Sequence, residues 1–158
     1  MRQLRRAILL TFVLAAVPLA RAGESPFVAA KAAAVDRSVR LLGELATIAR
    51  AHTTSYPNAQ TQARIRKILR PLKSVDDLSR FALLSFAVAG GQLVEHQNYD
   101  GVFDYAQWVC VERIASIPGE EAHTVLEYVL KPVLGRDAHP AEQFGEFISK
   151  QKRLSKLP

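Results

Sequence analysis

The sequence predicts an all-α fold, and three observations support this prediction. Apolar residues recur at helical spacing in successive segments of the chain. No segment alternates apolar and polar residues between hairpin turns, as a half-buried strand would. Proline and glycine mark the ends of most segments. We therefore expect a single compact domain of about six helices, whose second half could pair its helices into stacked, solenoid-like hairpins, although no internal repeat aligns.

The first two helices are expected from Ser25-Pro26 to about Ala51 and from about Ala59 to Leu69. A serine followed by proline is a typical helix start, because the hydroxyl caps a free N–H and the proline forfeits no hydrogen bond. A proline two residues after Leu69 should end the second helix, since proline disfavours helical geometry in the residue before it.

The third helix is expected to begin after Ser74, which caps it with Asp77 as its capping-box partner. Its residues are apolar on most faces, so it should lie at the centre of the fold. Gly90-Gly91 either ends this helix or marks a close contact within a longer one, and we expect continuation to about His96.

Three further helices complete the expected domain, residues 23–153. The fourth, about residues 102–117, is apolar nearly all round. The fifth, about residues 120–134, should be kinked in its last turn by Pro132. The sixth should start at Pro140, and the tail 154–158 is expected to fray.

Residues 1–22 have the three regions of a cleavable secretory signal peptide. A basic start precedes the charge-free run 7–19, and small residues follow at the expected cleavage position. The run is shorter than the roughly 20 apolar residues that span a bilayer. Arg5-Arg6 loosely resembles a twin-arginine signal, so both that export route and the general secretory route stay open. We expect a periplasmic or extracellular protein that begins near Gly23.

Removing the signal peptide changes the charge of the protein. It carries four of the 21 Lys and Arg residues and none of the 15 acids, so the net charge falls from +6 to +2. The high isoelectric point of the whole chain is thus no argument for nucleic-acid binding, and we expect no nucleic-acid partner.

Cys110 is the only cysteine, so no intramolecular disulfide can form. It lies in the most apolar segment, between Val109 and Val111. Free cysteine is often buried, and a reactive thiol needs solvent access and a lowered pKa. We expect Cys110 to be buried and chemically inert.

Glu120, His123 and Glu127 fall near one face of the fifth helix and are the best candidates for catalysis or metal binding. A carboxylate could orient the imidazole as a general base in a small exported hydrolase. A metal site would need further ligands from other helices, and no second Glu-x-x-His occurs. We expect an exposed polar stripe here and predict no catalytic residue, metal or cofactor.

The segment 64–73 is basic, with five cations and no acid. Apolar residues share its opposite face, so it suits either an acidic partner or an anionic membrane surface. An ordinary solvated helix is the plainer interpretation. The candidate binding residues here are Arg66, Lys67, Arg70 and Lys73.

A second candidate surface is acidic and aromatic. Tyrosine and tryptophan are enriched in binding hot spots, although Phe103 and Trp108 in this stretch are expected in the core. The candidate binding residues here are Tyr99, Asp100, Asp104 and Tyr105.

These observations favour an exported all-helical binding or adaptor module that acts on a protein partner, in the manner of an inhibitor or immunity protein. The alternatives are the small hydrolase and a peripheral membrane protein that uses segment 64–73. The oligomeric state is not predicted by the sequence.

Overall fold

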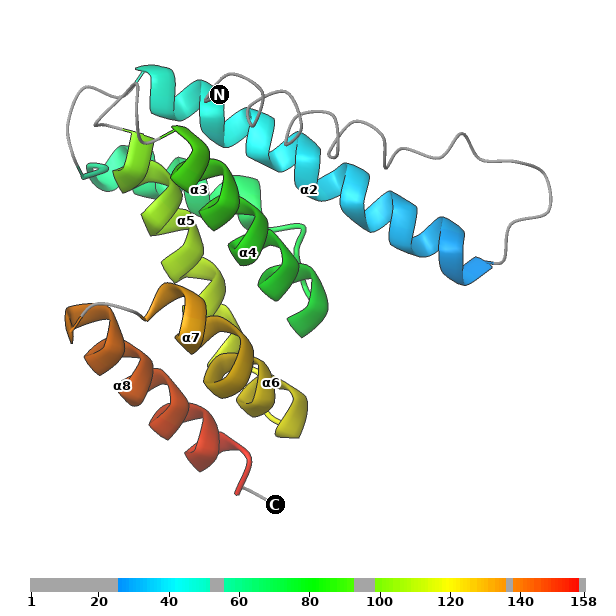
Figure 1. The fold of residues 1–158 in the computed structure, drawn as a ribbon, viewed down its shortest axis with the longest axis vertical. Coiled ribbons are helices and arrows are strands. Elements are labelled where there is room, and N and C mark those ends of the chain that lie inside the picture. Colours follow the sequence, from blue (N-terminus) through cyan, green and yellow to red (C-terminus); the bar gives the residue numbers. More distant parts are fainter. Residues whose placement is uncertain (1–25, 52–55, 93–98, 136–137, 157–158) are drawn as a thin grey trace, which may run out of the picture. The chain divides into compact units, whose positions relative to one another are not determined.

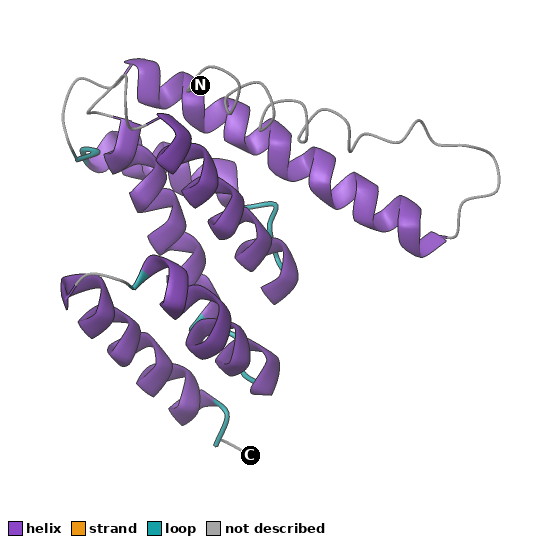
Figure 2. Cartoon of the chain, in the orientation of Figure 1, coloured by secondary structure: helices purple, strands orange, loops and turns teal. Residues whose placement is uncertain are grey.

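The structure is a computed structural model that describes residues 26–51, 56–92, 99–135 and 138–156. Within these ranges all regular structure is helical and forms six helices, which confirms the all-α prediction (Figures 1 and 2). The proposed signal peptide, residues 1–22, lies outside the described residues. The chain divides after Arg40 into two compact units, and the second, residues 41–158, contains the core described below.

The first two helices have the predicted bounds: α2, Pro26–Ala51, and α3, Ala59–Leu69. The third, α4, Val75–Gln92, begins where it was predicted to begin. The Asn58 side chain caps α3 by accepting a hydrogen bond from the N–H of Thr61 at 2.9 Å. Ser74 Oγ caps α4 in the same way, accepting from the N–H of Asp77 at 3.0 Å. Local capping chemistry therefore places both helix starts.

Two predicted helix starts differ from the structure. Helix α5, Tyr99–Ile114, begins three residues earlier than expected, and α8, Ala138–Leu154, begins two residues before Pro140. Both shifts involve the first helical turn, whose N–H groups have no partner within the helix. Pro140, which has no N–H, is tolerated there for that reason. Helix α4 continues through Gly90-Gly91 as predicted, but residues 93–98 lie outside the described part of the chain.

The expected fifth helix consists of three consecutive segments: α6, Glu120–Thr124; η1, Val125–Leu130; and α7, Lys131–Leu134. The middle segment, η1, is a π-helix. Pro132 has no N–H, and its ring would clash with the carbonyl four residues earlier in an α-helix. The wider π turns immediately before it change the hydrogen-bond register, so the distortion expected at Pro132 lies one turn earlier.

Gly135 follows α7 at a position where a larger residue would not fit. A Cβ at this position would lie 2.8 Å from the Lys131 carbonyl oxygen and 3.1 Å from Phe144 Cδ2. The close approach brings the end of α7 against α8, so the glycine permits the tight connection between these helices.

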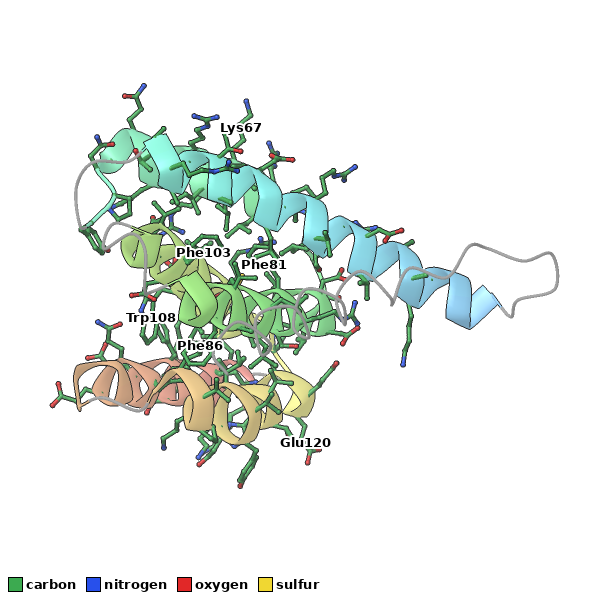
Figure 3. The ribbon with its side chains drawn as sticks, turned by 45° about the horizontal axis from the view of Figure 1, so that its top comes forward. Lys67, Phe81, Phe86, Phe103, Trp108 and Glu120 are labelled. Atoms are coloured by element: carbon green, nitrogen blue, oxygen red, sulfur yellow. The ribbon has the colours of Figure 1, made fainter. Side chains whose placement is uncertain are left out.

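The second unit is built from packed helix pairs. Helix α4 lies antiparallel to α5, and α6–η1–α7 lies antiparallel to α8 (Figure 1). Helix α3 packs on α5, and η1 contacts both α4 and α5, so the two pairs share one core. Phe81 and Phe103 are fully buried between helices, whereas Lys67 and Glu120 point outward (Figure 3).

Candidate binding surface

Helix α3 carries the basic segment on a firmly held support. Its apolar face, Ile65 and Leu69, is fully buried, and Leu72 in the following turn is buried as well. Burying side chains of this size contributes about 1.5–3 kcal/mol each. The opposite face of α3 is therefore presented to solvent by a helix that cannot easily change its orientation.

Arg66 joins the basic segment to α5. Its Nε donates a hydrogen bond to Tyr105 Oη at 2.8 Å, and its Nη1 donates to Glu112 Oε2 at 2.9 Å. Burial opposes the charged guanidinium, but the hydrogen bonds to Tyr105 and Glu112 prevail and raise the pKa of Arg66. The guanidinium also lies 5.6 Å from the centre of the Tyr105 ring. Two of the guanidinium nitrogens of Arg66 are thus used in contacts within the protein, which leaves fewer donors for a partner.

Tyr105 was expected on the acidic and aromatic surface, but only 8% of it is exposed. The ring is drawn inward because its hydroxyl finds a partner in Arg66, which satisfies the polar atom as the ring becomes buried. Asp104 is exposed, and the side chains of Tyr99 and Asp100 lie outside the described part of the structure. The two predicted surfaces are therefore joined by contacts between α3 and α5.

Arg113 on α5 has a structural role that sequence reasoning missed. Its guanidinium donates to the backbone carbonyl of Leu69 at 2.7 Å and also to that of Leu72. The Leu69 carbonyl lies in the last turn of α3, where no further N–H is available within the helix, and it also accepts from the N–H of Leu72 at 3.1 Å. The Leu72 carbonyl lies in the turn that follows. A cation there also suits the negative end of the helix dipole. Arg113 therefore fixes the end of the helix that carries the basic segment.

Four other cations of segment 64–73 are exposed to solvent. They differ from Arg66, since none of them forms a hydrogen bond through its side chain or an ion pair with any residue that the structure describes. Three of the candidate binding residues, Lys67, Arg70 and Lys73, belong to this group. We call the group the basic face: Arg64, Lys67, Arg70 and Lys73.

An exposed aromatic residue is linked to Arg66 of α3 through Tyr105. Tyr56 is 62% exposed, and its ring meets that of Tyr105 edge to face at a centroid distance of 6.3 Å. The hydroxyl of Tyr105 in turn accepts a hydrogen bond from Arg66 of α3, so Tyr105 connects the exposed Tyr56 with this arginine. Tyr56 precedes the helix cap Asn58, and only the fold brings it against Tyr105.

The candidate catalytic residues are brought together only in part. His123 Nε2 lies 3.0 Å from Glu127 Oε2, and Lys152 Nζ of α8 lies 3.8 Å from the same oxygen. Glu120 is exposed and does not join this cluster. Within the described ranges, no group of three His, Cys, Asp or Glu residues could hold a metal ion. The arrangement is a partly buried polar cluster between α6–η1 and α8, and His123 lines neither of the two depressions described below.

The start of α6 and the end of α8 are joined by polar contacts that centre on one buried side chain. Gln151 is fully buried, and its Nε2 donates to the Gly119 carbonyl at 2.6 Å and to Ser155 Oγ at 2.7 Å. Ser155 Oγ also accepts from the N–H of Gly119 at 3.2 Å. Gly119 has a φ of +121°, which favours glycine. Ser155, which we expected in a frayed tail, is thus held in place.

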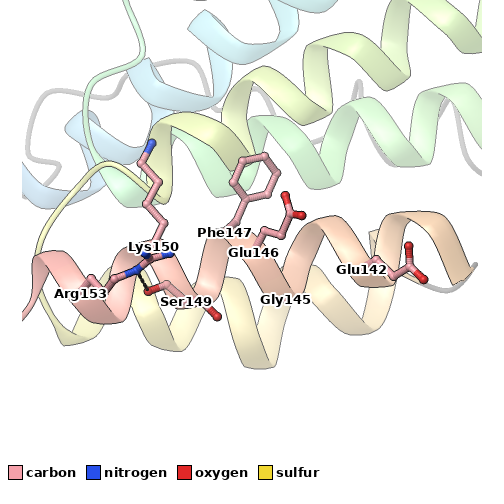
Figure 4. Close-up of a pocket in the computed structure, with 7 residues that line it drawn as sticks. All are labelled: Glu142, Gly145, Glu146, Phe147, Ser149, Lys150 and Arg153. Carbon is pink, nitrogen blue, oxygen red and sulfur yellow. Dashed lines mark hydrogen bonds between the residues drawn. The ribbon is translucent and has the colours of Figure 1, made fainter.

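Two surface depressions stand out among the described residues. All residues that line the first belong to α8, so it is an open hollow along one helix rather than a cleft between elements (Figure 4). The second lies between α3, α4 and α5 and is lined by residues from all three and from adjoining turns. Only the second therefore combines side chains that are distant in the sequence.

Cys110 is fully buried, as predicted. Burial raises the pKa of its thiol to about 12, although the nearby charge of Arg113 acts in the opposite direction. The thiol is therefore protonated at neutral pH and hidden from reagents.

We predict that native protein resists a thiol reagent at pH 7 and reacts stoichiometrically in denaturant. The protonated thiol stabilises the fold in full below pH 9, the pKa of a free thiol, and this contribution is lost as pH rises toward about 12. Between pH 9 and 11 the wild type should thus lose more stability than Cys110→Ala, which cannot ionise. Fast labelling of the native protein would contradict the prediction.

No helix in the described ranges is both long and apolar enough to cross a membrane. In comparisons with known proteins, no family model, no curated protein and no solved structure matches this chain.

Proposed function

We propose that this protein is an exported binding module whose basic face engages an acidic surface of a partner protein. The observation that carries the proposal is a set of exposed cations on and next to α3, a helix whose apolar face is buried in the core. Arg64, Lys67, Arg70 and Lys73 have no acidic partner among the described residues, while Arg66 and Arg113 hold the helix that carries them. Charges arranged in this way favour fast and specific association with an opposite charge.

The environment of Tyr56 supports a protein partner. Tyrosine and arginine are among the residues most enriched in binding hot spots, and Tyr56 lies next to the Tyr105–Arg66 contact. Tyr56 offers exposed aromatic area next to Tyr105, the partner of Arg66, and a purely electrostatic contact would not need such an area.

The burial of α3 argues against a membrane as the main partner. A helix that lies in a bilayer interface inserts its apolar face among the lipids. In α3 that face, including Ile65 and Leu69, is fully buried in the protein core. Only electrostatic attraction would remain for lipid, at about 1 kcal/mol per cation near an anionic surface.

Site-specific cross-linking tests the proposal. With a photo-cross-linking residue in place of Lys67, we expect an acidic protein to be captured from the periplasm or culture medium of the source cells. The same residue in place of Glu146, which is exposed on α8, should not capture it. Arg64→Glu combined with Arg70→Glu should weaken binding of the captured protein at least about tenfold, because two attractive contacts become repulsive.

The matched control is Arg153→Glu with Lys156→Glu, which makes the same change in net charge at exposed positions near the end of α8. This variant should bind within about twofold of the wild type if location matters more than net charge. Equal loss in both variants, or recovery on anionic vesicles with no protein captured, would show that the proposal is wrong.

A further inference from the structure

The depression between α3, α4 and α5 has a basic rim and an apolar floor. Its volume is about 310 Å³, and the sequence separates its parts by up to 51 positions. Leu78 and Ile117 contribute apolar surface, and Arg66, Lys73 and Arg113 contribute cations. Glu112 is the one acid that lines it. The depression adjoins the basic face through Lys73, which belongs to both.

Arg66 offers a further hydrogen-bond donor at this depression. Its Nε is used by Tyr105 and its Nη1 by Glu112, while Nη2 has no partner in the described part of the chain. The Glu112 contact demonstrates that a carboxylate oxygen can meet this guanidinium at 2.9 Å. Because a guanidinium presents donors along more than one edge, a second carboxylate can bind at Nη2 while Glu112 keeps its place.

Two lysines from other segments extend the positive charge around the same depression. Lys73, in the turn between α3 and α4, is exposed and unpaired among the described residues. Lys150 of α8 donates from Nζ to Ser116 Oγ at 3.0 Å, which brings its charge to the rim. The charge of Arg113 is partly offset by the carbonyls that it binds. Arg66, Lys73 and Lys150 therefore outweigh Glu112.

We propose that this depression is a carboxylate-binding subsite, which receives an aspartate or glutamate side chain of the acidic partner between Arg66 and Lys73. This proposal rests on the proposed function, because it names the place next to the basic face where the acidic partner would be held. The carboxylate is bound by Arg66 Nη2 and Lys73 Nζ, and the methylene groups of the partner side chain contact Leu78 and Ile117. Charge complementarity and the demonstrated Glu112 contact identify the ligand chemistry.

A hexaglutamate peptide is the probe for this subsite. In a titration followed by ¹H–¹⁵N NMR, we expect saturable shifts at the Arg66 Nε–H and at the backbone N–H groups of Lys73 and Ser116. Lys73→Gln should weaken peptide binding three- to tenfold, in line with about 1 kcal/mol for one exposed charge pair. This variant should fold normally, because the Lys73 side chain is exposed and has no hydrogen bond or ion pair to lose among the described residues.

Lys67→Gln is the matched control, because it removes the same charge from the basic face at a position that does not line the depression. It should weaken peptide binding less than twofold. Equal weakening by Lys67→Gln and Lys73→Gln would mean that only diffuse attraction operates, and the subsite would be wrong. Inorganic phosphate that binds at the same residues as tightly as the peptide would overturn the assignment to carboxylate.

Failure of the subsite can be separated from failure of the proposed function. Peptide-induced shifts at Arg64, Lys67 and Arg70 without shifts at Ser116 would refute the subsite. The proposed binding role of the basic face would not be affected by that result. A captured partner whose binding is unaffected by Arg64→Glu with Arg70→Glu would refute the basic face. Shifts confined to the depression in that case would still support a carboxylate site.

Discussion

Replacing Arg113 with methionine is expected to lower the free energy of unfolding by about 3 kcal/mol. Arg113 supplies the hydrogen bonds to the carbonyls of Leu69 and Leu72, and both bonds come from a charged donor. Such bonds contribute about 1.5–3 kcal/mol each. The Leu69 carbonyl keeps its hydrogen bond from the N–H of Leu72, so the added desolvation cost falls on the Leu72 carbonyl. Because these bonds close the end of α3, the loss should be measurable by urea denaturation and as faster hydrogen exchange in α3.

Two further variants make this prediction specific. Arg113→Lys keeps the charge but cannot present the same two-pronged donor, so it should recover less than half of the lost stability. Ser116→Ala removes an exposed hydroxyl one turn away and should cost less than about 0.5 kcal/mol, as most surface substitutions do. An Arg113→Met variant as stable as the wild type would mean that the two carbonyls are satisfied by water and that α3 does not depend on this contact.

Helix type and approximate position were predictable from the sequence because the relevant signals are local. The bounds of α3 follow from Asn58 before it and Pro71 after it, and the start of α4 follows from Ser74. The start of α5 was not predictable in the same way, because Gly101 reads as part of a turn but is acceptable in a first helical turn. The π-helix η1 lies before Pro132, and no sequence rule separates it from a simple kink.

The candidate site was predictable only where exposure follows from helical periodicity. Lys67 and Arg70 lie on the outer side of α3, opposite Ile65 and Leu69, as the apolar spacing indicates. The role of Arg66 was not accessible, because its partners Tyr105 and Glu112 are 39 and 46 positions away. Contacts at that separation depend on how α3 and α5 pack, and the sequence carries no local signal for that packing.

The attachment of α8 to the rest of the core depends on a group of aromatic rings. Phe144 is fully buried, and its ring lies 5.4 Å from that of Trp108 on α5, centroid to centroid. Phe147, one turn later, lies 6.1 Å from the same indole. Trp108 was expected in the core and is partly buried against it. As the only tryptophan of the chain, it reports directly on this contact.

Phe144→Ala should lower the free energy of unfolding by about 4 kcal/mol, because removing a buried phenylalanine costs both transfer free energy and the energy of the cavity left behind. The emission of Trp108 should shift to longer wavelength, since the ring that shields it is lost. Phe147→Ala is the matched control: Phe147 is only partly buried, so it should cost less than half as much and change the emission less. If both variants lose the same stability, α8 is held mainly by its polar contacts at Gln151 and Ser155 rather than by Phe144.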